Sequence, residues 1–244
     1  MKIDQVHTVV DGLCCMSFEQ GRVISDLVLE NRFRDLLELG FNHGVSSCYL
    51  AAALDEQGGG LLTTIDLEEA RTRSPNIGEL LGRLGLERYV KPCFEPTSYL
   101  WRLMRMLEED PSPRFDFCYI DGAHDWFCDG FAFLLVDRLL RPGGMIVFDD
   151  LDWSYATSRT LKATERVLNM PADERELPQV RKVYELLVKT HPGYGDFAEK
   201  DGWAYARKLR GEGGAAPLRS ETVYVDREVG LGAALLRMAR RVAR

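Results

Sequence analysis

The chain has 244 residues, a hydrophobic fraction of 45% and a formal net charge of −7. This charge argues against a general affinity for nucleic acid or for an anionic membrane, because both need basic surface. The sequence has no run of 18 apolar residues that would predict a membrane-spanning helix, and no basic and apolar stretch typical of a signal peptide at its start. We therefore expect one α/β domain over residues 1–244, located in the cytoplasm.

The six cysteines contain no Cys-x-x-Cys pair, so the sequence offers little support for a zinc-thiolate or redox site. Several stand in apolar runs, as Cys118 does between Phe117 and Tyr119. We expect the cysteines to be reduced and buried as small apolar side chains. They are Cys14, Cys15, Cys48, Cys93, Cys118 and Cys128.

Helical and extended patterns alternate over the first 150 residues. Ser17 and Gln20 fit a capping box that begins a helix over 17–30. Short apolar runs that end in glycine or aspartate predict strands over 35–39, 61–65, 89–94, 115–120 and 145–148. Helical spacing predicts the intervening helices over 46–54, 77–84, 99–107 and 131–140, the last followed by a turn over 141–144.

This alternation predicts a doubly wound, mostly parallel sheet with helices on both faces. The strands are apolar almost throughout, as expected when both faces are covered. Ligands of such sheets bind at the carboxyl ends of the strands. Gly40, Asp66, Asp121, Asp149 and Asp150 should therefore lie on one rim.

Beyond Asp150 the pattern is weaker. It predicts a helix over 177–189, strands over 203–209 and 221–225 that pair antiparallel at the sheet edge, and a basic amphipathic helix over 231–244. We expect residues 151–200 to cover the site of the second substrate.

The turn after the first strand carries the pattern Glu-x-Gly-x-x-x-Gly-x-Ser over Glu38 to Ser46. A dinucleotide site would favour Gly-x-Gly-x-x-Gly, which admits a pyrophosphate at a helix N-terminus. The wider glycine spacing and the acidic residue suit a cationic cofactor without phosphate. Asp66 follows Gly44 by 22 residues, at the tip of the next strand, where a carboxylate can accept hydrogen bonds from both ribose hydroxyls.

Three carboxylates, from Asp121, Asp149 and Asp150, end the fourth and fifth strands. Like charges packed together repel, and a divalent cation with oxygen ligands relieves the repulsion. Such a cation, Mg²⁺ above all, would lower the pKa of a substrate hydroxyl. His124 lies three residues after Asp121 and could take the released proton, since an imidazole accepts protons near neutral pH.

These motifs resemble the class I S-adenosylmethionine-dependent methyltransferases, and more narrowly the catechol and macrolide-sugar O-methyltransferases. The resemblance covers about residues 16–155, which would form the cofactor half, with acceptor-covering and C-terminal elements over 151–244. It implies a seven-stranded sheet, S-adenosylmethionine as cofactor, and metal binding by Asp121, Asp149 and Asp150. The cofactor residues that it implies are Glu38, Gly40, Asn42, Gly44, Ser46, Asp66, Leu67, Ser98 and Asp121.

The catechol enzymes carry lysine three residues after the first metal ligand, where this chain has His124. This difference favours another hydroxyl acceptor, such as a sugar, a polyol or a natural-product glycoside. The resemblance thus implies a metal-assisted O-methyltransferase with Asp121 and His124 as catalytic residues. The alternatives are a metal-independent N- or C-methyltransferase and a catalytically degenerate cofactor-binding or assembly protein. A small hydroxylated molecule is the expected partner, and a homo-oligomer is compatible with the sequence.

Overall fold

The computed structural model describes residues 2–210, and its elements follow the predicted alternation up to Phe148. The strands are β1 (Asp35–Leu39), β2 (Leu61–Leu67), β3 (Val90–Glu95), β4 (Phe115–Ile120), β5 (Leu140–Phe148), β6 (Tyr194–Lys200) and β7 (Trp203–Lys208). The α-helices are α1 (Lys2–Val10), α2 (Phe18–Asn31), α3 (Val45–Glu56), α4 (Ile77–Leu84), α5 (Tyr99–Glu109), α6 (Trp126–Leu139), α7 (Glu165–Leu168), α8 (Ala172–Glu176) and α9 (Gln179–Val183). Shorter helical turns are Glu68–Thr72, Glu87–Tyr89 and, directly after α9, the π-helical turn Tyr184–Val188.

The strands form one seven-stranded sheet in the order β3-β2-β1-β4-β5-β7-β6. The strands β1 to β5 pair in parallel, whereas β7 pairs antiparallel with both β5 and β6. The predicted mostly parallel sheet with an antiparallel edge pair is thereby confirmed.

The predicted pairing of β7 with a strand over 221–225 was wrong. Its partner at the sheet edge is β6, which precedes it, and the two are joined at Asp201 and Gly202. Both residues have positive φ angles, of 53° and 83°, as the tight hairpin turn of an Asp-Gly pair requires. The sequence analysis did not predict this hairpin, because β6 is polar and largely exposed and shows no apolar alternation. The predicted strand over 221–225 and helix over 231–244 lie outside the described residues, so the single domain over 1–244 stays a prediction.

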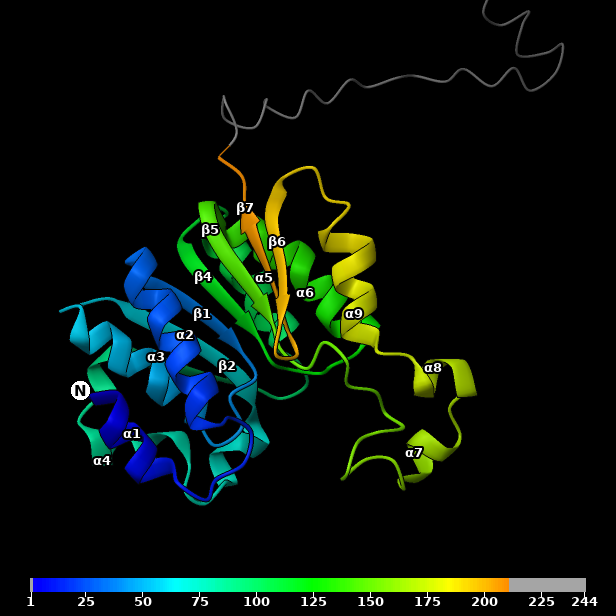
Figure 1. The fold of residues 1–244 in the computed structure, drawn as a ribbon, viewed down its shortest axis with the longest axis horizontal. Coiled ribbons are helices and arrows are strands. Elements are labelled where there is room, and N and C mark those ends of the chain that lie inside the picture. The colour runs from blue at the N-terminus through cyan, green and yellow to red at the C-terminus, as the bar shows by residue number, and fades with distance from the viewer. Residues whose placement is uncertain (1, 211–244) are drawn as a thin grey trace, which may run out of the picture. The chain divides into compact units, whose positions relative to one another are not determined.

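Helices cover both faces of the sheet (Figure 1). Residues of α1 to α4 pack with one face, where Leu36 of β1 contributes to their apolar cluster. Residues of α5, α6 and α9 pack with the other face, and the next residue, Leu37, contributes there. Successive side chains of a strand point to opposite faces, so β1 is buried from both sides.

Backbone hydrogen bonds just beyond the strands align the carboxyl ends of neighbouring strands. The backbone N–H of Gly40 donates to the carbonyl of Ile65 at 2.8 Å, and that of Asp121 donates to Leu39 at 2.8 Å. The N–H of Asp149 donates to Ile120 at 2.9 Å. The residues that follow β1, β4 and β5 therefore meet at one rim, as predicted.

Local differences from the predicted elements have local causes. The structure adds α1, and it starts β5 five residues early, at Leu140. The pairing of β4 with β5 shifts register between Phe115, opposite Leu140, and Phe117, opposite Met145. The predicted turn over 141–144 is thus an irregularity inside β5, with Gly143 at a φ of 87°.

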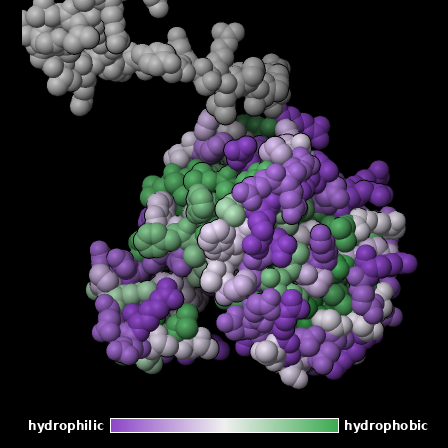
Figure 2. All heavy atoms as spheres, turned by 180° about the vertical axis from the view of Figure 1, so that it is seen from behind, coloured by the Kyte–Doolittle hydropathy of each residue, from purple (hydrophilic) through white to green (hydrophobic). Residues whose placement is uncertain are grey.

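Among the described residues, no helix is long and apolar enough to cross a membrane. Several large apolar side chains are nevertheless exposed, and Figure 2 shows apolar surface gathered on one side of the face turned away in Figure 1. On α6 the exposed large apolar side chains are Phe127, Phe131 and Leu134, which recur at helical spacing. Such a stripe is compatible with the expected homo-oligomer, which stays a prediction.

Candidate active site

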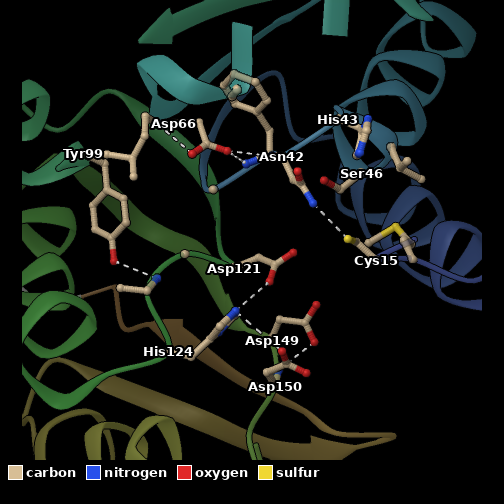
Figure 3. A pocket seen from close by; sticks show the side chains of 18 of the residues that line it. Cys15, Asn42, His43, Ser46, Asp66, Tyr99, Asp121, His124, Asp149 and Asp150 are labelled. Carbon is tan, nitrogen blue, oxygen red and sulfur yellow. Dashed lines mark hydrogen bonds and ion pairs between the residues drawn. The ribbon is translucent and has the colours of Figure 1, made fainter. Parts of the chain in front are cut away.

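A cavity of about 510 Å³ lies at the carboxyl ends of the parallel strands. Most of the residues predicted from the sequence line it: Gly40, Asn42, Ser46, Asp66, Leu67, Ser98, Asp121, His124, Asp149 and Asp150. Glu38 and Gly44 are not among the lining residues. Figure 3 shows the loop after β1 and Asp66 on one side of the cavity, and Asp121, His124, Asp149 and Asp150 on the other.

The two glycines of the loop are required by close approaches. Gly40 has a φ of 86°, and a Cβ built on it would lie 2.0 Å from the carbonyl oxygen of Asp121. Gly44 has a φ of 95° and begins α3, and a Cβ there would lie 2.6 Å from Cγ1 of Ile77. Only glycine readily adopts these φ angles and also has no Cβ that would overlap the neighbouring atoms. Gly44 therefore affects the shape of the loop through its contact with Ile77 and does not itself line the cavity.

Asp66 fixes the loop through the backbone. One of its carboxylate oxygens accepts hydrogen bonds from the N–H groups of Phe41 and Asn42, at 2.8 and 2.6 Å. The other accepts one from the N–H of Leu67 at 2.6 Å. A carboxylate has about four acceptor positions, so at least one remains for a ligand hydroxyl. The ligand role of Asp66 stays a prediction, and its structural role was not predicted from the sequence.

Glu38 is completely buried beneath the loop. Its carboxyl group accepts hydrogen bonds from the hydroxyls of Ser47, on α3, and Thr64, on β2. Burial raises the pKa of Glu38 to about 7, although these hydroxyls and Ser46 oppose the rise. Glu38 thus ties β1 to its neighbours below the cavity, and a direct contact with a cofactor stays a prediction.

The carboxylates on the opposite side are crowded. Burial, followed by the charges of Asp149 and Asp150, holds the pKa of Asp121 well above its usual range. Asp149 is itself buried, and its two oxygens accept hydrogen bonds from the hydroxyl of Tyr119 and, at 2.6 Å, from the N–H of Asp150. A divalent cation would offset the repulsion among these groups, so the donor set fits a metal ion.

His124 faces this cluster. Its Nε2 atom lies 3.7 Å from Oδ1 of Asp121 and 3.6 Å from Oδ2 of Asp150. One atom from each of these three side chains falls within 4.8 Å of the others, close enough to surround one ion. His124 and Asp150 have φ angles of 55° and 53°, and the His124 ring packs on Trp153 with 5.3 Å between ring centroids. Both residues line the cavity, and such uncommon backbone angles are typical of functional sites.

Tyr99, which the sequence analysis did not select, supports the loop that follows β4. Its hydroxyl donates a hydrogen bond to Asp129 at 2.5 Å and accepts one from the N–H of Ala123 at 3.4 Å. A Cβ on Gly122 would lie 2.5 Å from the Tyr99 ring. Tyr99 and Asp129 are 30 residues apart and follow no shared pattern, so only the folded chain could reveal the pair.

Ser98 lines the cavity and also begins α5, since its hydroxyl accepts a hydrogen bond from the N–H of Leu100 at 3.2 Å. Other lining residues that the sequence analysis did not assign to the site include Cys14, Cys15, Met16, Gln20, Glu69, Arg73 and Thr97. Those from 14 to 20 come from the α1–α2 loop and the start of α2, for which the sequence carried no ligand motif.

Comparison with known proteins matches residues 37–151 to the family described as "Methyltransferase domain". The chain is 29% identical over 136 residues to a catechol O-methyltransferase of Niastella koreensis, a match that covers 56% of this chain and 58% of that relative. Residues 37–151 form a class I methyltransferase domain.

Solved structures share the fold of this methyltransferase domain. The O-methyltransferase TomG from Streptomyces achromogenes, solved with SAM, has a TM-score of 0.61 and 22% identity, covering 86% of this chain and 88% of its own. An O-methyltransferase from Bacillus cereus, solved with SAH, has a TM-score of 0.62 and 22% identity, covering 85% and 90%. The matched range 37–151 of the family spans β1 to β5 and therefore contains most of the cavity.

We predict that Gly40→Ala destabilises the methyltransferase domain more than Gly58→Ala. Both glycines have φ near 80°, but nothing lies within 4 Å of a Cβ on Gly58. Gly58→Ala should cost about 1–2 kcal/mol for the backbone angle alone. Gly40→Ala adds the overlap with Asp121 and should cost about 2–5 kcal/mol. Urea unfolding measures both, and equal losses would contradict the role of the Gly40–Asp121 approach.

Proposed function

We propose that the chain is an S-adenosylmethionine-dependent O-methyltransferase that methylates a hydroxyl of a small molecule with the help of a divalent cation. The observation that carries the proposal is the single cavity with two opposite sides: the glycine loop with Asp66, and the Asp121–His124–Asp149–Asp150 group. A methyl donor and a deprotonated acceptor need to meet in one such space.

The cavity suits a cationic cofactor. Its lining contains five carboxylates, from Asp66, Glu69, Asp121, Asp149 and Asp150, against one guanidinium, from Arg73. The buried side-chain oxygen of Asn42 has no hydrogen-bond partner among the described residues, so it is available to a donor such as the ammonium of the methionine part. The cofactor, when bound, supplies a methyl group on a positively charged sulfur.

Each cofactor residue has a role in this proposal. Asp66 and Leu67 bind the ribose side, and Ser98 flanks the adenine. Gly40, Asn42, Ser46 and Asp121 surround the methionine side. Glu38 and Gly44 act indirectly, because they hold the loop and the start of α3 in place. The occurrence of SAM and SAH in the solved structures of the same fold supports S-adenosylmethionine as the cofactor.

On the acceptor side, Asp121, Asp149 and Asp150 would hold the divalent ion, Mg²⁺ in this proposal. The ion, when bound, lowers the pKa of an acceptor hydroxyl. His124 takes the hydroxyl proton at Nε2, the atom that faces the cluster. Trp153 keeps the imidazole in place by packing on its ring, and Tyr119 keeps Asp149 in place through its hydroxyl. These residues orient the acceptor oxygen toward the methyl group.

The acceptor class in this proposal is a sugar, a polyol or a natural-product glycoside. The names of the similar proteins, which include a catechol O-methyltransferase and an enzyme of tomaymycin synthesis, support an oxygen acceptor. Because the chain covers 58% of the length of the catechol relative, the acceptor of that enzyme is not carried over. A panel with a catechol, an aromatic glycoside and a polyol, assayed with radiolabelled S-adenosylmethionine, tests the class.

Calorimetry should detect binding of S-adenosylmethionine to the wild-type chain. We predict that Asp66→Ala weakens it by at least about tenfold, the equivalent of one charged hydrogen bond. Asp26→Ala, which removes an exposed carboxylate of α2, is the control and should bind like the wild type. Absence of binding to the wild type would overturn the proposed function, and unweakened binding to Asp66→Ala would remove Asp66 from the site.

Mn²⁺, followed by electron paramagnetic resonance, can replace Mg²⁺ as a probe of the metal site. We predict that Asp150→Asn weakens Mn²⁺ binding by at least about tenfold, because a carboxylate ligand is lost. Asp152→Asn is the matched control, since Asp152 lies two residues on and pairs instead with Arg181 at 2.5 Å. Full transfer activity in the presence of a chelator would support the metal-independent alternative instead.

His124→Gln tests the proposed base. On the best acceptor of the panel, its kcat should fall about 10²–10⁴-fold, the usual contribution of general base catalysis. Binding of S-adenosylmethionine and Mn²⁺ should not change. His43→Gln is the control, because His43 also lines the cavity but directs Nδ1 to the carbonyl of Pro75 at 2.7 Å. Loss of Mn²⁺ binding by His124→Gln would make His124 a metal ligand and not the base.

A further inference from the structure

Two neighbouring cysteines contradict the expectation that the cysteines are buried. Cys48, Cys93 and Cys118 are buried as predicted and Cys128 is half-buried, whereas Cys14 and Cys15 are exposed. They lie in the loop between α1 and α2, and the thiol of Cys15 donates to the sulfur of Cys14 at a distance of 2.8 Å. Both residues line the cavity of the proposed active site. The pair therefore places two thiols in contact at a ligand site.

The pair is connected to the glycine loop through Asn42. The side-chain Nδ2 of Asn42 lies 3.2 Å from the sulfur of Cys15 and 3.9 Å from that of Cys14. The backbone N–H of the same Asn42 donates to Asp66. Figure 3 shows Asn42 between Asp66 and Cys15. A change at the cysteines thus reaches the cofactor side of the cavity through one residue.

The two thiols differ in reactivity. Partial desolvation, with the hydrogen bond to Cys14, raises the pKa of Cys15 to about 12. The thiolate is the reactive form, so Cys15 reacts poorly with an external reagent. This leaves Cys14 as the exposed thiol that can attack the reagent, and Cys15, 2.8 Å away, is positioned to react with the sulfur of Cys14.

We propose that Cys14 and Cys15 form a thiol–disulfide exchange site for low-molecular-weight disulfides, and that its oxidation weakens cofactor binding. The second part rests on the proposed function. No Cys-x-x-Cys motif indicates this site, because the two cysteines are adjacent in sequence.

The exchange balances with the disulfide R–S–S–R as the oxidant. The Cys14 thiolate attacks one sulfur, a Cys14–S–S–R bond forms, the reagent's S–S bond breaks, and RS⁻ leaves and takes up a proton. Because the Cys14 sulfur lies 2.8 Å away, the small thiolate fraction of Cys15 is enough for the second step: Cys15 loses its proton to water, attacks the Cys14 sulfur and expels the second RS⁻, which is protonated in turn. The two cysteines are oxidised to one disulfide, and the reagent is reduced to two RSH.

Such a disulfide would be easily reversed. Adjacent Cα atoms are about 3.8 Å apart across a trans peptide, below the range of about 4.4–6.8 Å usual in disulfides. A bond outside the usual geometry is more reducible and belongs to the labile class. An excess of a small thiol would therefore restore the reduced pair.

Oxidation should act on the cofactor side of the cavity. A bond between the two sulfurs removes the Cys15 thiol hydrogen and strains the backbone at both residues, because their Cα atoms lie closer than a relaxed disulfide requires. The α1–α2 loop should therefore change its backbone where it lines the cavity, and this change moves Cys15 relative to Asn42 and breaks the contact between them. Losing one hydrogen bond corresponds to a weakening of about three- to tenfold.

The test treats the full chain with oxidised glutathione and reads intact mass and peptide maps. The wild type should lose the mass of two hydrogens within the peptide that contains Cys14 and Cys15, and a small thiol should reverse it. Cys15→Ser should instead keep glutathione on Cys14, because no second thiol resolves the mixed disulfide. Cys14→Ser should react little, because only the poorly reactive Cys15 remains.

Calorimetry with S-adenosylmethionine then compares each protein with itself before and after treatment. The affinity of the wild type should fall about three- to tenfold, and that of Cys14→Ser should not change. A stable glutathione adduct on the wild type, or no reaction, would overturn the exchange site. Oxidation without a change in affinity would overturn the coupling. Absence of binding by the reduced wild type would overturn the proposed function, while the mass change would still report the exchange site.

Discussion

The close approach of Gly40 to the carbonyl of Asp121 is the constraint on which the rest of the site depends. With no side chain at Gly40, the ends of β1 and β4 come together, and the N–H of Asp121 reaches the carbonyl of Leu39. The cofactor loop then starts beside the carboxylate that begins the acceptor side. Any Cβ at this position would separate the two sides, because the opposing atoms belong to the backbone and have little freedom to move.

The carboxylates on the two sides of the cavity have different environments. Glu38 is buried under the loop and helps to hold it, whereas Asp66 is held at the surface of the cavity by three backbone N–H groups. On the other side, the raised pKa values of Asp121 and Asp149 show the cost of placing carboxylates together away from water. A dication, a cationic cofactor, or both would lower that cost, and this is the physical basis of the proposed function.

The α1–α2 loop adds a feature that the carboxylates do not supply. Cys14 and Cys15 reach the cavity from outside the matched range 37–151. Asn42 links them to Asp66, so the chemistry of two thiols is connected to the position of the cofactor loop. The proposed exchange site therefore differs from the methyl-transfer chemistry but acts on the same cavity.

The sequence by itself determined the alternating fold and the rim that carries Gly40, Asp66, Asp121 and Asp149, because these depend on local periodicity and on the topology of parallel sheets. It missed the β6–β7 hairpin, whose polar strand has no apolar alternation, and the burial of Glu38 below the cavity. Only the tertiary structure decided which side chains share one space. Contacts such as Tyr99 with Asp129, or Asn42 with Cys15, join residues far apart in the chain, and no periodicity encodes them.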